Sequence, residues 1–251
     1  MTTAHSGSGD LRRSMALLWE GKEPAARGPR PGLSLDRIVT AAVELADREG
    51  LAALSMRKVA AELGVGTMSL YRYVPGKGEL LDLMLDHVNG PTEPLEEHRG
   101  KHWRVLLEYI AEGTWELYTA HPWLLQVNQT RPVLGPKGMA GFDFALAALN
   151  GLGLSGPEKI GIILAVDHFV TGTARTFVLQ QQVGRESELT DEEFWEAQGP
   201  YLERAMAGGS YPEVAALPEG AFDFDGRQAL EFGLRPLLDG LQLFIDSKQP
   251  S

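Results

Sequence analysis

Apolar side chains recur every three or four residues along most of this 251-residue chain, a spacing typical of amphipathic helices. The pattern predicts no strand and shows no internal repeat, so an all-α fold is expected. Helices are expected over residues 33–48, 55–63, 67–74, 78–88, 103–120, 139–152, 155–183, 191–207 and 227–247.

Residues 55–77 carry the most informative pattern. Ser55 is a good N-cap for a short helix, and Gly64 stands where that helix should end in a left-handed residue. A second short helix follows and ends before Pro75. Two such helices form a helix-turn-helix, whose second helix enters the major groove of DNA. A helical hairpin in an ordinary core is the alternative. The segment's net charge of +3 and the hydroxyl, aromatic and basic side chains of its second helix favour DNA binding.

Several motifs in the same order resemble the DNA-binding domain of the tetracycline-repressor (TetR) family of bacterial regulators. The resemblance spans residues 33–88. The matching motifs are Ala46-Asp47-Arg48-Glu49-Gly50, Arg57-Lys58-Val59-Ala60, Leu63-Gly64-Val65, Leu70-Tyr71-Arg72-Tyr73-Val74 and Lys77-Gly78-Glu79-Leu80-Leu81. The resemblance implies a homodimeric, all-helical regulator that leaves its double-stranded operator DNA when a small-molecule effector binds.

The resemblance also implies which side chains meet DNA. Residues that offer phosphate contacts position the protein, and those that reach base edges specify the sequence. Lys77, Tyr71 and Tyr73 are expected to contact phosphates. Arg57, Thr67 and Met68, near the starts of the two helices, can reach base edges. Arg72 is expected to point elsewhere. The expected DNA-binding residues are Arg57, Thr67, Met68, Ser69, Tyr71, Tyr73 and Lys77.

Charge and composition agree with a DNA-binding protein of the cytoplasm. The net charge is −11, but residues 1–90 hold 11 basic and 11 acidic residues, so the acidic excess lies outside the proposed DNA-binding part. The absence of cysteine excludes disulfides and thiolate metal sites. No apolar run reaches the roughly 18 residues that span a bilayer, so no membrane partner is expected. His98 and His102 have metal-ligand spacing but no third ligand, and no cofactor or metal is expected.

The chain divides into three parts. Residues 1–32 are rich in Ser, Gly, Pro and Arg and predict a flexible basic arm, within which residues 11–20 can form a short helix. The arm either enters the minor groove beside the recognition helix or is a solvated tail. Residues 33–80 are the expected helix-turn-helix domain, and residues 81–251 the helical effector-binding and dimerisation domain.

The C-terminal part resembles the effector domain of the tetracycline repressor. The resemblance rests on Asp167-His168-Phe169 with Thr171-Gly172, and on Thr130-Arg131-Pro132. The family's drug-contacting histidine falls on His168, which could alternatively be a core histidine. Val127 and Thr176 stand where the family has a metal-binding histidine and a supporting glutamate, which disfavours tetracycline itself. A large, flat, partly apolar effector is expected. The candidate ligand-binding residues are Trp123, Val127, Arg131, Phe142, His168, Phe169 and Thr176.

Helices 157–183 and 227–247 resemble the family's dimerisation pair, although the same stripes could close the core of a monomer. No catalytic motif is evident, so an enzyme is not expected. A helical enzyme and an effector-independent DNA-binding protein stay as alternatives, and repression and activation are both open.

Overall fold

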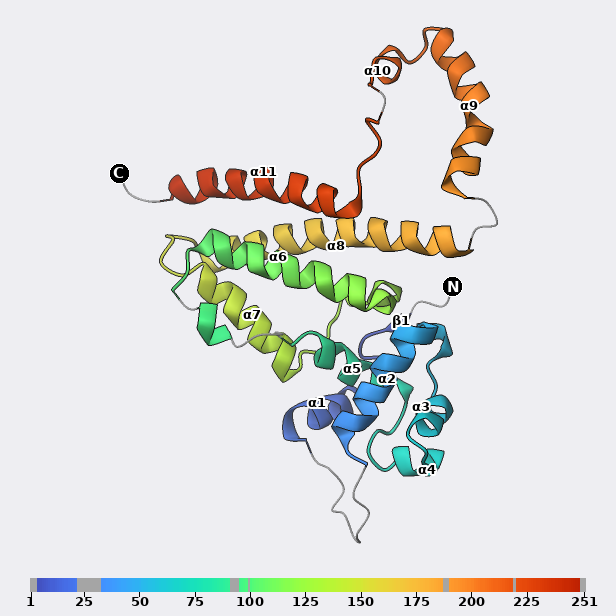
Figure 1. Cartoon of the computed structure of the whole chain (residues 1–251). Coiled ribbons are helices and arrows are strands. Elements are labelled where there is room, and N and C mark those ends of the chain that lie inside the picture. Colours follow the sequence, from blue (N-terminus) through green and yellow to red (C-terminus); the bar gives the residue numbers. More distant parts are fainter. Residues whose placement is uncertain are drawn as a thin grey trace.

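The structure, a computed structural model, describes residues 4–21, 33–90, 95–98, 100–186, 190–218 and 220–248 (Figure 1). The expected all-α fold is confirmed, apart from one pair of two-residue strands in the described residues. The elements are β1 (Ala4–His5), α1 (Leu11–Glu20), α2 (Leu35–Glu49), the 3₁₀ helix η1 (Leu51–Ala53), α3 (Met56–Glu62), α4 (Thr67–Leu70), α5 (Lys77–Val88), η2 (Leu95–His98), α6 (Trp103–Ala120), η3 (Pro122–Gln126), β2 (Val127–Asn128), α7 (Pro136–Ala148), α8 (Gly156–Glu186), α9 (Asp191–Ala207), α10 (Pro212–Ala215) and α11 (Gly226–Asp246).

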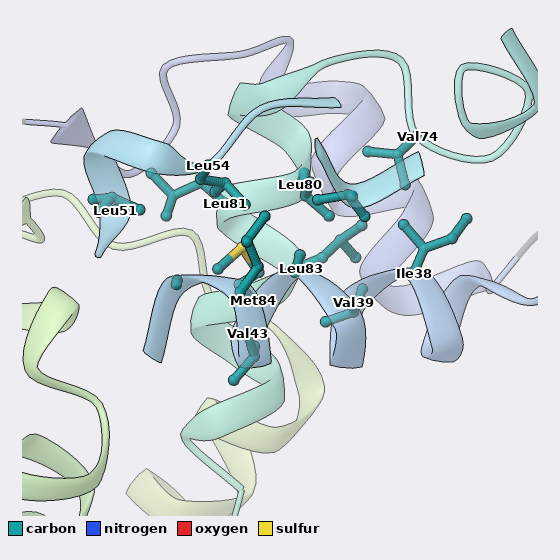
Figure 2. Packing of buried hydrophobic residues seen from close by; sticks show 14 of the residues in the cluster. Ile38, Val39, Val43, Leu51, Leu54, Val74, Leu80, Leu81, Leu83 and Met84 are labelled. Carbon is teal, nitrogen blue, oxygen red and sulfur yellow. The ribbon is translucent and has the colours of Figure 1, made fainter. Parts of the chain in front are cut away.

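The N-terminal unit is built around the crossing of α2 and α5 (Figure 2). Ile38 of α2 and Leu80 and Met84 of α5 are fully buried in its core. α5 runs unbroken through residue 80, the expected end of the helix-turn-helix domain. Because Leu81 and Met84 pack in the same core as α2, the whole of α5 belongs with the N-terminal unit.

The helix-turn-helix has the expected start and turn. The Ser55 hydroxyl accepts a hydrogen bond from the backbone N–H of Lys58, and Gly64 has a φ of 64°, which favours glycine. The second helix is shorter than expected, since α4 covers one turn and continues as a turn through Tyr73. Its N-cap is Gly66, which has no side chain to bond. Burial of Leu70 and Val74 therefore holds the short helix in position.

The C-terminal unit is a layer of α6, α7, α8 and α11. α8 packs against α6 on one side and α11 on another, with Val170 and Ala174 fully buried between them. Gly226 and Gly233 let α11 approach α8 closely, because a Cβ there would overlap the rings of Phe177 and Phe169 respectively. This tight packing sets the rotation of α8 about its axis.

The expectation of a flexible N-terminal arm is wrong for residues 4–21. β1 pairs in parallel with β2, and the hydroxyl of the buried Ser14 donates to Asp82 Oδ2 over 2.6 Å. The backbone N–H of Asp10 donates to Glu79 Oε1 over 2.7 Å. Hydrogen bonds to two carboxylates of α5 thus replace the solvent contacts that were expected. The short helix expected here is α1, and residues 22–32 of the predicted arm lie outside the described residues.

Large apolar and aromatic side chains of α8 and α9 are exposed to solvent. Gly156–Gly184 of α8 is long and apolar enough to cross a bilayer, judged by length and composition alone, as core helices of soluble proteins also are. α9 and α10 extend away from α8 and α11 (Figure 1). Trp195 and Tyr201 of α9 are among the exposed aromatic side chains of this projecting pair.

Candidate DNA-binding surface and effector cavity

The outer face of the helix-turn-helix presents the side chains expected to meet DNA. Met68 is 76% exposed and Tyr71 43% exposed, and Arg57 and Lys77 are also exposed. Thr67, Ser69 and Tyr73 are half-buried at the edges of this face. Four of the seven predicted residues are therefore exposed and three are half-buried, while Leu70 of the same segment is fully buried.

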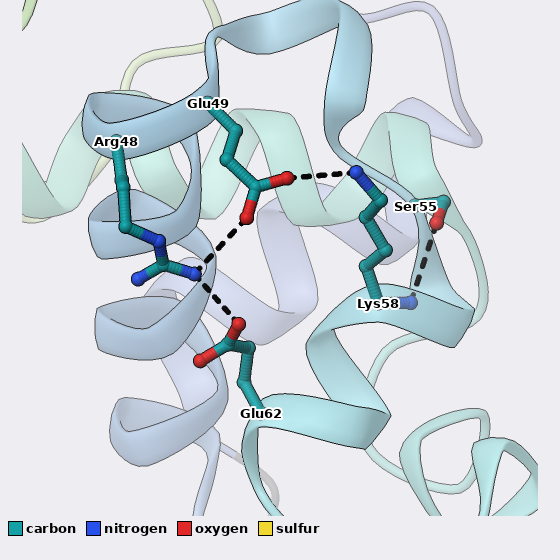
Figure 3. A network of polar contacts seen from close by, with 5 residues as sticks. All are labelled: Arg48, Glu49, Ser55, Lys58 and Glu62. Atoms are coloured by element: carbon teal, nitrogen blue, oxygen red, sulfur yellow. Dashed lines mark hydrogen bonds and ion pairs between the residues drawn. The ribbon is translucent and has the colours of Figure 1, made fainter.

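An ion-pair network ties α3 to α2 (Figure 3). Arg48 Nη2 donates to Glu62 Oε1 over 2.6 Å, and Lys58 Nζ donates to Glu49 Oε2 over 2.7 Å. The hydrogen bond from Lys58 is the main reason that the pKa of Glu49 lies below its ordinary value, and Arg48 adds to the shift. Lys58 is thereby engaged within the protein.

Arg57 and Lys77, unlike Lys58, have side chains that are not engaged in such contacts with any described residue. Within the described part of the chain, neither side chain has an ion-pair or hydrogen-bond partner. Exposed cations without internal partners are suited to phosphate contacts, since they exchange only water and counterions when DNA binds.

A cavity of about 480 Å³ lies in the C-terminal unit, bounded by α6, α7, α8 and the end of α5. Its size falls in the usual range for small-molecule sites. Apolar and aromatic side chains dominate the lining, with a few polar groups among them. The lining includes Val88, Asn89, Tyr109, Glu116, His121, Phe142, Phe144, Ile163, Val166 and Asp167.

Two carboxylates, Asp167 of α8 and Glu116 of α6, lie in the cavity wall. Solvent reaches Asp167 through the cavity, yet the surrounding helices desolvate it enough to raise its pKa above the ordinary value. His121, also in the wall, is tied to the N-terminal unit, because its Nδ1 lies 2.8 Å from Asp47 Oδ1. The cavity therefore contacts the N-terminal unit both through α5 and through His121.

Comparisons with known proteins match both units. Residues 38–84 match the description "Bacterial regulatory proteins, tetR family", and residues 94–245 match "Tetracyclin repressor-like, C-terminal domain". The HTH-type transcriptional repressor DrrR1 of Streptomyces coeruleorubidus is 51% identical over 99% of this chain and 92% of its own length. This chain belongs to the TetR family. It is a helix-turn-helix transcriptional repressor, and the predicted resemblance is confirmed.

Solved structures of TetR-family proteins share the fold over most of the chain. ActR from Streptomyces coelicolor, in complex with actinorhodin, is 30% identical with a TM-score of 0.65, covering 85% of this chain and 99% of ActR. The tetracycline repressor protein class E of Escherichia coli is 25% identical over 86% of this chain and 94% of its own length.

The cavity of this TetR-family chain includes only one of the seven predicted ligand residues, Phe142. Trp123 and Val127 are buried in the core shared with α2 and α5. Arg131 is exposed in the loop after β2, and Thr176 is exposed on α8. Within one chain, the structure does not bring these four residues together around the cavity.

The rotation of α8 about its axis explains why the other two predicted residues, His168 and Phe169, do not line the cavity. Successive helical residues point about 100° apart. Ile163, Val166 and Asp167 line the cavity, so His168 turns to the exposed face and Phe169 packs over Gly233 of α11. Sequence reasoning missed Asp167, although its position four residues after Ile163 puts both on one helical face.

Proposed function

We propose that this repressor binds a palindromic operator as a homodimer and leaves it when a small effector occupies the cavity. One observation carries the proposal: α5 forms the core of the DNA-binding unit at its start, and its last residue, Val88, lines the cavity. One continuous helix therefore connects the two sites, so a change of its position at one end is transmitted to the other.

The DNA contacts divide by chemistry. Lys77, Tyr71 and Tyr73 position the protein on phosphates. Arg57 and Thr67 offer hydrogen bonds to base edges, and Met68 offers an apolar contact to a thymine methyl group. These roles are supported by the exposure of Met68 and by the lack of partners for Arg57 and Lys77 among the residues that the structure describes.

The proposed dimer forms through α8 and α11. Along one face of α8, apolar side chains are exposed at helical spacing, including Ile160, Leu164, Leu179 and Val183. A depression of about 610 Å³ along α11 is lined by Phe224 and Phe232 together with the polar or charged side chains of Gln228, Glu231, Arg235 and Asp239. The exposed apolar row of α8 is suited to burial against a second copy. His168 and Thr176 lie on the same exposed side of α8, so a second chain would change their surroundings.

The relation between cavity and recognition surface supports release by an effector. An effector that prefers one arrangement of α5 shifts the spacing of the two recognition helices in the dimer. ActR is solved in complex with a small molecule, which supports a similar use of the cavity here. We place the protein in the cytoplasm, where α8 would serve as a dimerisation helix and not as a membrane span.

Fluorescence anisotropy of the purified protein on the DNA flanking its own gene tests this proposal. We expect tight binding that weakens with salt and that a scrambled duplex of the same length does not match, with one dimer per site. Equal affinity for both duplexes at every salt concentration, after removal of co-purified small molecules by unfolding and refolding, would overturn the proposed operator function.

A further inference from the structure

We infer that the effector is a cation: a flat, largely apolar molecule with a protonated amino group that pairs with Asp167, assisted by Glu116. The inference rests on the proposed function, because it assigns a chemistry to the ligand of the same cavity. It concerns this chain's own lining residues, which differ from those that the family resemblance implied.

The charge of the cavity wall has one sign. Asp167 and Glu116 are its carboxylates, and no lysine or arginine of the described residues lines it. His121 also lines the cavity, but its Nδ1 lies 2.8 Å from Asp47 Oδ1, so a positive charge on this ring is already paired with a carboxylate. A ligand with a carboxylate would therefore meet repulsion, and no unpaired basic side chain of the described lining would offset it.

The two cavity carboxylates also differ from other acidic groups of the same helices. On α6, Glu108 pairs with Arg104 and Glu112 pairs with Arg227. At the start of α8, Glu158 pairs with Lys248 over 2.6 Å. In the described ranges, Asp167 and Glu116 have no such ion pair or side-chain hydrogen bond. The unpaired acids are those that face the cavity.

Partial desolvation disfavours the charged form of Asp167 when no ligand is bound. Desolvation is the main cause that raises the pKa of this carboxyl, opposed only by a weak attraction from His168. A partly desolvated carboxylate gains from a partner of opposite charge, because solvent stabilises and screens its charge less fully than in bulk water. A bound ammonium group would supply that partner and offset the desolvation of the Asp167 carboxylate.

Aromatic side chains of the wall suit the remainder of such a ligand. Tyr109 and Phe144 lie with ring centroids 6.3 Å apart in an edge-to-face arrangement, and Phe142 also lines the cavity. His98 stacks on Tyr109 at a centroid distance of 4.0 Å and holds that ring in place. These rings can pack on a flat apolar body and attract a nearby cation through their faces.

Three probes that share one ring system and differ in charge test the inference. They are 9-(aminomethyl)anthracene, which is cationic at neutral pH, 9-(hydroxymethyl)anthracene, which is neutral, and anthracene-9-carboxylate, which is anionic. Calorimetric titration of the DNA-free full-length protein gives each affinity. We expect the amine to bind about tenfold more tightly than the alcohol, and the carboxylate to bind most weakly.

Two variants and a control locate the charge effect. Asp167→Asn should reduce the affinity for the amine to that for the alcohol and leave the alcohol unchanged, and Glu116→Gln should cause a smaller loss. Asp143→Asn, on the exposed side of α7 outside the cavity lining, should change nothing. Amine preference that survives Asp167→Asn combined with Glu116→Gln would overturn the assignment.

The same probes separate this inference from the proposed function. If the alcohol or the carboxylate binds at least as tightly as the amine and releases operator DNA, the cation assignment fails and the proposed function stands. If no probe binds while operator binding is intact, the cavity itself fails as the effector site, and the cation inference fails with it.

Discussion

Trp123 Nε1 donates a hydrogen bond to Asp47 Oδ1 over 2.7 Å, so that η3 of the C-terminal unit holds the last turn of α2. His121 Nδ1 reaches the same oxygen over 2.8 Å. The Asp47 carboxylate therefore contacts the rings of both Trp123 and His121, and His121 also lines the effector cavity. The contact is a second connection between cavity and DNA-binding unit, independent of α5.

Removal of this carboxylate should loosen the contact between the units. Asp47→Ala leaves the Trp123 N–H without its partner in a buried position, which costs on the order of 1–3 kcal/mol of stability. Chemical denaturation at equal protein concentration would measure the change, because dimerisation makes stability depend on concentration. Glu44→Ala, an exposed acidic position on the same helix, is the control and should stay within about 0.5 kcal/mol of the parent protein.

Lys77 provides a test of the DNA-binding surface. Lys77→Ala should weaken operator binding at low salt and reduce the slope of log affinity against log salt by about 1, since one phosphate contact is lost. Anisotropy titrations at four salt concentrations would measure both quantities. Lys159→Ala, whose ammonium group bonds Asn150 in the C-terminal unit, should leave affinity and slope unchanged. An unchanged slope for a dimeric Lys77→Ala would contradict the docking.

Tyr71→Ala should abolish specific operator binding with the dimer intact, because the exposed ring supports DNA contacts and not the core. Light scattering after gel filtration would establish the dimer, and anisotropy on operator and scrambled duplexes would measure specificity. Retained discrimination between the two duplexes would show that the recognition surface lies elsewhere.

The docked N-terminal segment makes a different prediction. Ser14→Ala removes the hydroxyl that donates to the buried Asp82, so the protein should lose about 1–2 kcal/mol of stability. Ser8→Ala, at an exposed position of the same segment, is the matched control. Limited proteolysis should cleave Ser14→Ala within residues 4–21 faster than the parent protein. Equal cleavage rates would contradict a structural role for this hydrogen bond.

Particular residues show what the sequence could predict. Caps such as Ser34 and Ser55 act on neighbouring backbone amides, so local sequence is enough to place the helices that they start. The bond between Ser14 and Asp82 joins residues 68 positions apart, and no periodic pattern encodes it. The lining of the cavity depends on the rotation of α8, which packing at Gly226 and Gly233 sets. That is why Asp167, and not His168, faces the cavity.

The raised pKa of Asp167 predicts how stability depends on pH. The folded protein holds this pKa above the unfolded value near 3.8, so the neutral acid contributes stability that is fully present below that pH. The contribution is lost as pH rises through the folded pKa. At pH 7 the ligand-free Asp167→Asn variant should therefore be the more stable protein, by less than about 1 kcal/mol, because solvent in the cavity screens the charge. Urea denaturation between pH 4 and 8 would show a stability difference between Asp167→Asn and the parent protein that is constant near neutrality and shrinks toward pH 4. A variant less stable than the parent protein at pH 7 would mean that Asp167 already has a favourable partner in the empty cavity.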